Sequence, residues 1–335
     1  MRSLFLSRLR GRLLRPVLAR LDAIETNQRS LAAGVAALRE DARQTRFAVA
    51  SIQAQRARTA GSLREAEFKA YSQFGEDGAI QWLIARVPIA TRNFVEFGVE
   101  SYRESNTRFL LEHDGWRGLI IDAGTDHERF IRDQGLGWRH EIEAVSAFIT
   151  VDNINDLLAD QPDDTGLLSV DIDGNDYWIL SALTRIRPRI LVCEYNSLFG
   201  PTAAVSVPYE ASFDRTAAHH STLYFGASIS AIAHWASGRG YRLVGSNAQG
   251  VNAFFVRDDV AGDLPALTAP EAWVASPIRQ ARDERGALTL LGGIDPQRRL
   301  IGGLPLVDVV SGAALSVADL DAIEAQAVAT AGEPG

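Results

Sequence analysis

Apolar residues recur every three or four positions between residues 14 and 55 and predict one long helix. If position a of a seven-residue repeat falls on residue 14 and position d on residue 17, ten of the twelve core positions are apolar. The core positions hold Leu14, Val17, Leu21, Ile24, Gln28, Leu31, Val35, Leu38, Ala42, Thr45, Val49 and Ile52. A repeat of 3.5 residues sustained this long is typical of a coiled coil, in which Gln28 and Thr45 could fix the register. We expect a homo-oligomer through residues 14–55; a single amphipathic helix packed on the chain's own domain is the alternative.

A break at Gly61-Ser62 ends this pattern, and short apolar runs follow, separated by helix-length stretches. They lie at 93–98, 118–122, 142–148, 166–171 and 189–195. Nearly continuous apolar runs that alternate with helices are typical of a parallel sheet buried on both faces. Two further runs, 241–244 and 253–256, are joined by so short a link that they must pair antiparallel. The pattern predicts an α/β fold whose mostly parallel sheet ends in a β-hairpin.

Helices are expected between these strands, and the chain divides into three parts. The expected helices lie at 72–84, 102–113, 152–159 and 227–239, and another opens at a capping box formed by Thr125 and Glu128. Beyond residue 257, Pro, Gly and Ala increase, with short β-like runs at 288–291 and 306–310. We expect a basic coiled-coil helix over 1–60, an α/β domain over 61–257 and a small β-rich appendage over 258–335, disordered from about residue 325.

The charges are distributed unevenly along the chain. Residues 1–65 contain 13 arginines, no lysine and five acidic residues, a balance of +8; the whole chain carries −8, so the remainder carries −16. An acidic body lacks the clustered cations that phosphate contacts need, which argues against a nucleic-acid partner. Residues 1–20 hold six arginines and no acid, so they could form a helix at a membrane surface or only a solvated helix end.

The chain has one cysteine, Cys193, and no run of 18 apolar residues. A single cysteine excludes an internal disulfide and a cysteine-based zinc site, and its place in an apolar run predicts a buried thiol. The basic N-terminus lacks an apolar segment followed by a small-residue cleavage site, so we expect a cytoplasmic protein, at most peripheral to the inner face of the membrane.

Two acidic strand ends carry the first candidate chemistry. The first strand ends at Glu96-Phe97-Gly98, and the second ends at Asp122, 24 residues after Gly98. This spacing is typical of a nucleotide-binding βαβ unit in which the second acid holds a ribose. The first turn has one glycine and two glutamates, so it would repel a pyrophosphate, whereas S-adenosylmethionine has a ribose and two cationic groups but no phosphate. We expect Glu96, Gly98 and Asp122, and Asn106 in the following helix, to contact that cofactor; an ordinary turn, a helix N-cap and an exposed helix face are the alternatives.

The densest polar cluster follows the fourth strand, at Asp171-Ile172-Asp173-Gly174-Asn175-Asp176. Strand alternation puts Asp171 and Asp173 on one side, and Glu194 ends the next strand, so the three carboxylates should converge. They could supply a general base or share a divalent cation; alternatively, Asp171 touches the cofactor while Asp173 caps the next helix. We favour a site without a metal, in which Asp173 and Glu194 are catalytic and Asp171 contacts the cofactor. His219 is a further candidate base, or a surface histidine without a role.

Several of these segments together resemble the motifs of FkbM-type S-adenosylmethionine-dependent methyltransferases. The matching segments are 71–77, 94–98, 105–107, 115–122 and 168–174, within residues 71–257. The resemblance implies a class I methyltransferase-like (Rossmann-like) fold, S-adenosylmethionine as cofactor, and O-methylation of a hydroxyl on a sugar, glycan or related small molecule. The chain departs from the family in the turn 100–104, which lacks the usual second glycine, and at Asp122-Ala123, where the family usually has Glu-Pro.

Two other functions fit parts of the sequence. Asp171-Ile172-Asp173 also fits the short DxD motif with which metal-dependent glycosyltransferases hold a nucleotide-sugar diphosphate, although the two glutamates of the first turn are then unexplained. The second alternative is a non-catalytic coiled-coil scaffold with an inactive methyltransferase-like domain. The missing second glycine in the turn 100–104 favours this alternative.

Overall fold

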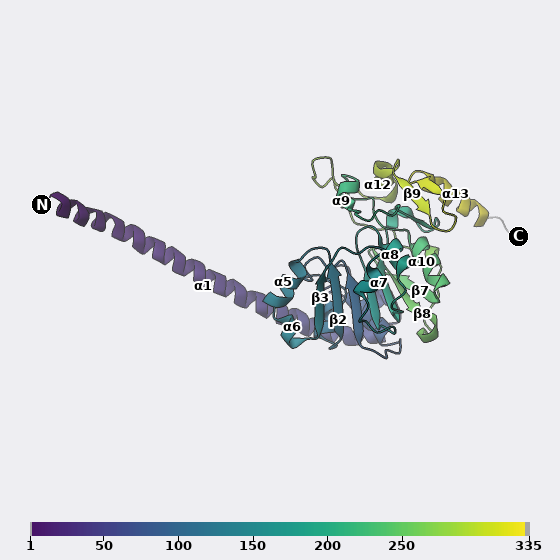
Figure 1. Cartoon of the computed structure of the whole chain (residues 1–335), viewed down its shortest axis with the longest axis horizontal. Coiled ribbons are helices and arrows are strands. Elements are labelled where there is room, and N and C mark those ends of the chain that lie inside the picture. The colour runs from purple at the N-terminus through teal and green to yellow at the C-terminus, as the bar shows by residue number, and fades with distance from the viewer. Residues whose placement is uncertain (1, 332–335) are drawn as a thin grey trace. The chain divides into compact units, whose positions relative to one another are not determined.

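The structure is a computed structural model that describes residues 2–331, without the side chains of residues 2–15, 17, 328, 330 and 331. It forms two compact units, Met1–Ile52 and Gln53–Gly335. The first unit is most of helix α1 (Arg2–Thr59), purple in Figure 1, which confirms the long helix predicted for residues 14–55. The heptad side chains from Leu21 to Ile52 are exposed, with Leu31 and Leu38 each 69% accessible, and self-association stays a prediction.

The membrane contact predicted for residues 1–20 falls largely on side chains outside the described residues. No helix in the described part of the chain combines the length and the apolar character needed to cross a bilayer.

The second unit begins inside α1, because the last residues of this helix pack into the body. Ala54 and Ala57 are buried, and Arg58 donates a hydrogen bond to Asp114 Oδ1 at 2.6 Å. The body therefore extends back to Gln53, whereas the sequence pattern placed its start at residue 61.

A seven-stranded sheet forms the centre of the body, in the order β3-β2-β1-β4-β5-β8-β7. The strands are β1 (Asn93–Phe97), β2 (Arg117–Asp122), β3 (Ile142–Ser146), β4 (Leu167–Val170), β5 (Ile190–Glu194), β7 (Tyr241–Ser246) and β8 (Asn252–Arg257). The first five are parallel, and β8 pairs antiparallel with both β5 and β7. This topology confirms the predicted fold class: an α/β, class I methyltransferase-like, mostly parallel sheet that ends in an antiparallel hairpin.

Both faces of the sheet are buried. On one face, Val95, Leu168 and the buried thiol of Cys193 share a core with α7 (Ile154–Leu157), α8 (Asp176–Ala182) and α10 (Ile229–Gly238). Phe94 and Phe254 are fully buried on the other face. The helices of the body are α2 (Leu63–Ala66), α3 (Glu76–Ile84), α4 (Arg108–Glu112), α5 (Asp126–Asp133), α6 (Leu136–Arg139), α7 (Ile154–Leu157), α8 (Asp176–Ala182), α9 (Arg215–Ala218), α10 (Ile229–Gly238) and α11 (Ala269–Ala272).

Two local helix predictions are wrong. The stretch 102–113 gives only the short α4, because Tyr102 has a left-handed φ of 59° and the residues up to Thr107 form turns. The capping box is not formed: the Thr125 side chain makes no cap hydrogen bond, and Glu128 instead accepts one from Ser146 Oγ at 2.7 Å.

One of the two β-like runs predicted for the C-terminal appendage, 306–310, forms a strand, and this strand joins a sheet that includes the preceding chain. β9 (Pro305–Asp308) pairs with β10 (Ala314–Ser316) and also with β6 (Val205–Ser206), and helices α12 (Ile294–Ile301) and α13 (Asp319–Ala331) complete it. Residues 288–291 make only an isolated bridge at Leu288. Residues 325–331 are helical rather than disordered, and 332–335 lie outside the described residues.

Candidate active site at the carboxyl ends of the strands

A cavity of about 400 Å³ opens at the carboxyl ends of the parallel strands. Glu96 of β1, Asp122 of β2 and Glu194 of β5 line it, together with Asp171, which follows β4. The strand order reverses between β1 and β4, and open α/β sheets bind ligands in the crevice at this point. The sheet therefore gathers most of the predicted site residues around one cavity.

The cavity is strongly acidic. Eight carboxylates line it, from Glu76, Glu96, Glu100, Glu104, Asp122, Asp171, Asp173 and Glu194. Among the lining residues that the structure describes, Arg215 is the one cationic side chain. Such a wall favours cationic ligand groups and disfavours phosphates that lack a metal ion.

The backbone N–H groups of the turn after β1 form hydrogen bonds within the protein. Gly98 N donates to the carbonyl of Ile121 at 3.0 Å, Glu100 N to Asp122 Oδ2 at 2.7 Å, and Tyr102 N to the carbonyl of Val99 at 2.7 Å. These groups are not free to bind a pyrophosphate, as they would be in a glycine-rich dinucleotide turn. The structure thus agrees with the sequence argument against a phosphate-binding turn.

Gly98 is required by the protein's own backbone. Its φ is +73°, and a Cβ atom at this position would lie 1.5 Å from the carbonyl oxygen of Asp171. The close approach joins the ends of β1 and β4, so Gly98 sets the position of Asp171 in the cavity wall.

Glu96 fixes the segment that replaces the predicted helix. Its carboxylate accepts hydrogen bonds from Ser105 Oγ at 2.6 Å, from Asn106 N at 2.8 Å, and from both the backbone N and the Oγ1 of Thr107. Burial raises the pKa of Glu96 above its usual value, although these hydrogen bonds oppose part of the rise. Glu96 lines the cavity, but most of its hydrogen-bonding capacity goes to residues 105–107.

Asn106 and Asp122 also line the cavity and hold neighbouring segments. Asn106 is 9% exposed and donates from Nδ2 to Ser169 Oγ at 3.1 Å, which ties the 105–107 turn to β4. Asp122 accepts from Glu100 N and, at 2.8 Å, from Gly124 N. It is not the N-cap of α5, which is Thr125.

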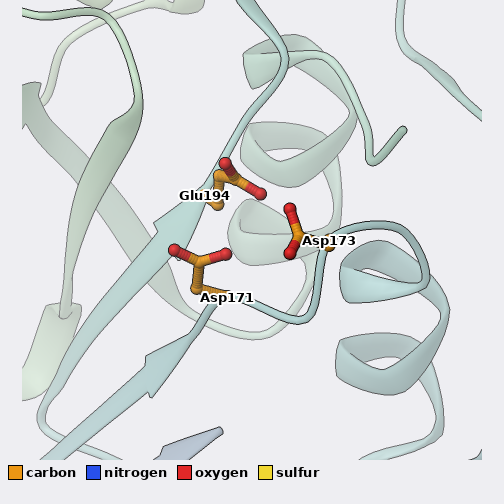
Figure 2. Close-up of side chains that lie close together, drawn as sticks. All are labelled: Asp171, Asp173 and Glu194. Carbon is orange, nitrogen blue, oxygen red and sulfur yellow. The ribbon is translucent and has the colours of Figure 1, made fainter. Parts of the chain in front are cut away.

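The carboxylates of Asp171, Asp173 and Glu194 face one common space (Figure 2), and one oxygen from each lies within 4.8 Å of the other two. Glu194 is buried, Asp171 is partly exposed, and Asp173 is exposed. Burial, and then the charge of Asp173, raises the pKa of Asp171; burial, and then the charge of Asp171, raises the pKa of Glu194. The sequence placed these residues together correctly, and their catalytic role stays a prediction.

One arginine faces this carboxylate cluster. Arg215 forms an ion pair with Asp173, donates to the carbonyl of Thr222 at 2.8 Å, and lies 3.8 Å from the ring centroid of Phe225. Its orientation is therefore fixed from three sides, and its charge is directed at Asp173.

His219 lies outside the cavity lining. Its Nδ1 is 2.8 Å from Ser221 Oγ, its ring packs against that of His220, and burial lowers its pKa. The structure does not bring His219 to the carboxylates, so the prediction that it is a base loses its geometric support.

Sequence reasoning missed a buried contact between the start of the body and the hairpin. Glu76 Oε1 accepts hydrogen bonds from Asn247 Nδ2 at 2.7 Å and Asn252 Nδ2 at 2.8 Å. Asn252 lies directly opposite Glu194 in the β5–β8 pair, so their side chains share one face of the sheet. The cavity also receives Ser276, Ile278, Gln280 and Gln297 from the appendage, which no motif in the sequence had indicated.

No family model and no curated protein match this sequence. Among solved structures, a putative O-methyltransferase from Klebsiella pneumoniae is 12% identical, with a TM-score of 0.33 over 63% of this chain and 87% of its own. The O-methyltransferase TomG from Streptomyces achromogenes is 18% identical, with a TM-score of 0.34 over 62% and 86%. The METTL16 methyltransferase domain is 14% identical, with a TM-score of 0.27 over 36% of this chain and 51% of its own, so the match spans about half of that domain.

Proposed function

We propose that the protein is an S-adenosylmethionine-dependent O-methyltransferase. The observation that supports this most directly is the cavity itself, which lies at the carboxyl ends of the parallel strands and has eight carboxylates in its wall. A sulfonium and an ammonium group suit such a wall, while the bonded N–H groups of the turn after β1 are not available to a pyrophosphate. We also propose that the protein is a member of the FkbM-type family, as the sequence motifs predict.

The β1 and β2 ends form the half of the cavity that we assign to the cofactor. Asp122 stands at the tip of β2, where an acid can accept hydrogen bonds from ribose hydroxyls. Glu96 stands near the end of β1 and Asn106 in the 105–107 turn that is bonded to it, and we assign both to the methionine end. Asp122 already accepts two backbone hydrogen bonds, and each carboxylate oxygen can accept more than one.

The other half of the cavity has a lining suited to a polyhydroxylated acceptor. Gln280 and Gln297 bring amide groups, and Phe213 and Phe225 bring aromatic rings. Amides pair with hydroxyl groups as donors and acceptors, and ring faces pack on the C–H surfaces of sugars. This composition supports a sugar, glycan or related small-molecule acceptor.

In the proposed reaction, a carboxylate of the cluster formed by Asp171, Asp173 and Glu194 accepts the proton of the acceptor hydroxyl. When bound, S-adenosylmethionine would supply a methyl group to the acceptor oxygen, and the electron pair of the broken carbon–sulfur bond would stay on sulfur. We assign the uptake of the hydroxyl proton to Glu194 and Asp173, whose carboxylates share one space in the cavity, and the cavity walls would hold the two reactants in line. The raised pKa of Glu194 makes it a stronger base once it is ionised.

Calorimetry separates the proposal from both rivals. The full chain is titrated with S-adenosylmethionine, and then with UDP-glucose with manganese present in both cell and syringe. We expect saturable binding of S-adenosylmethionine and none of UDP-glucose. Binding of UDP-glucose alone would support the glycosyltransferase, and binding of neither would support the inactive scaffold.

A further inference from the structure

We propose that Asp171, Asp173 and Glu194 bind a divalent cation, Mg²⁺ or Mn²⁺, on the acceptor side of the cavity. The sequence favoured a site without a metal because no third ligand such as histidine was evident. Three observations in the structure, on this cluster and on Asn252, favour a metal site instead.

The first observation is the spacing of the oxygens. One carboxylate oxygen from each of the three residues lies within 4.8 Å of the other two. Hard divalent cations bind oxygen ligands at about 2.0–2.6 Å, so two ligands of one ion lie at most about 5 Å apart. The three side chains can therefore reach one ion from the positions shown in Figure 2.

The second observation is the lack of a cationic partner for Asp171 and Glu194, which form the inner pair of the cluster. Glu194 is 8% exposed, and its Oε2 has no hydrogen-bond partner. Asp171 has a side-chain hydrogen bond with Glu194, so the two carboxyl groups contact each other rather than a cationic group. Glu96 and Asp122 in the same cavity are satisfied by backbone and hydroxyl donors. Buried carboxylates are normally paired, so the inner pair lacks a positive partner.

Arg215 does not supply that partner. Its ion pair is with Asp173, the exposed member of the cluster, and its other hydrogen bonds go to the carbonyl of Thr222. When all three carboxylates are ionised, the charge of Arg215 leaves a net charge of −2, which one divalent ion would neutralise.

The third observation is a separate buried oxygen in the cavity wall, on the residue that pairs with Glu194. Asn252 is 3% exposed, lines the cavity, and faces Glu194 across the β5–β8 pair. Its Nδ2 is held by Glu76, which fixes the amide orientation and leaves Oδ1 without a partner. Carboxylate and amide oxygens are the ligands that Mg²⁺ and Mn²⁺ prefer, and the described part of this cluster offers neither imidazole nor thiolate.

The role of the ion rests on the proposed function. Three protein carboxylates leave positions open for an acceptor hydroxyl, or for two adjacent hydroxyls of a sugar. An oxygen on a divalent cation loses its proton more readily, and that proton would pass to solvent or to a carboxylate of the cluster. The site would thus select acceptors that can chelate.

Titration of the full chain with Mn²⁺ alone, followed by the electron paramagnetic resonance signal of free Mn²⁺, tests the site. We expect one bound ion per chain, competed by Mg²⁺, with affinity about tenfold weaker or worse in Glu194→Gln and in Asp173→Asn. Asp263→Asn, which removes an exposed carboxylate outside the cavity, should bind Mn²⁺ as the unchanged chain does. If the isosteric Glu194→Gln does not fold by circular dichroism, the exposed Asp173→Asn carries the test.

Absence of stoichiometric Mn²⁺ binding, or binding unchanged in both variants, would overturn the proposal. So would binding that needs UDP-glucose, which belongs to the DxD glycosyltransferase. S-adenosylmethionine binding is measured separately in metal-free buffer. Loss of the cation site therefore leaves the methyltransferase proposal standing, and the reverse also holds.

Discussion

Gly98 lies so close to Asp171 that a Cβ atom on the glycine would stand 1.5 Å from the aspartate carbonyl oxygen. The residue that the sequence marks as a cofactor contact is thus first a backbone contact between two strand ends. It places Asp171, and through it the carboxylate cluster, at the edge of the cavity.

Gly98→Ala should therefore destabilise the body far more than a glycine substitution in open space. Gly115 is the matched control, because its φ of +66° is also left-handed but nothing lies within 4 Å of a Cβ there. We expect Gly115→Ala to cost about 1 kcal/mol and Gly98→Ala at least about 2 kcal/mol more in free energy of unfolding, measured by urea denaturation. Equal losses in the two variants would show that the β1 and β4 ends can separate freely.

Asp122→Ala should weaken S-adenosylmethionine binding by about 1–3 kcal/mol, the range for removing one partner of a buried hydrogen bond. Asp126→Ala is the control, since Asp126 lies outside the cavity lining and pairs with Arg129 on α5. Dissociation constants come from calorimetry at a temperature where both variants are folded. Unchanged affinity in Asp122→Ala would remove Asp122 from the cofactor site.

The exposed stripe of α1 should drive self-association. Leu31→Glu combined with Leu38→Glu places two charges at core positions of the heptad pattern and should give a monomer. Ala33→Glu combined with Ala37→Glu adds the same charges outside those positions and should leave the oligomer intact. Light scattering of the full-length variants measures the mass, and one mass for all of them would contradict a coiled coil over residues 14–55.

The buried Asp77 should make stability depend on pH. Its Oδ2 accepts hydrogen bonds from Ala70 N, Tyr71 N and Ser72 N, yet burial raises its pKa from 3.8 to about 6. Since the folded state binds this proton more tightly, Asp77 lowers the free energy of unfolding as pH rises from about 4 to about 6.

Asp77→Asn lacks this titration. Compared with the variant, the unchanged chain should lose up to about 3 kcal/mol between these pH values and no more above about pH 7. Denaturation curves at several pH values give the difference. Parallel pH profiles would mean that Asp77 does not titrate in this range.

The sequence was sufficient for the sheet and for the carboxylate cluster. The apolar runs are nearly continuous because both faces of the sheet are covered, so each strand could be located from its own residues. Asp171 and Glu194 could be placed together because consecutive parallel strands usually lie side by side with their ends at one edge.

Other parts depend on contacts that no local pattern encodes. Glu76 and Asn252 are 176 residues apart and meet only because the chain before β1 folds onto the hairpin. The two-residue strand β6 is too short to produce a periodicity. The 102–107 turn depends on Glu96, whose carboxylate binds residues 105–107 more strongly than helix propensity could hold them.

The most direct test of the central claim is a crystal structure of the full chain grown with S-adenosylhomocysteine. We predict density for the ligand along the ends of β1 and β2, with the ribose hydroxyls on Asp122 and the amino-acid end near Glu96 and Asn106. Density elsewhere on the protein, or a cavity that excludes the ligand at saturating concentration, would contradict the account.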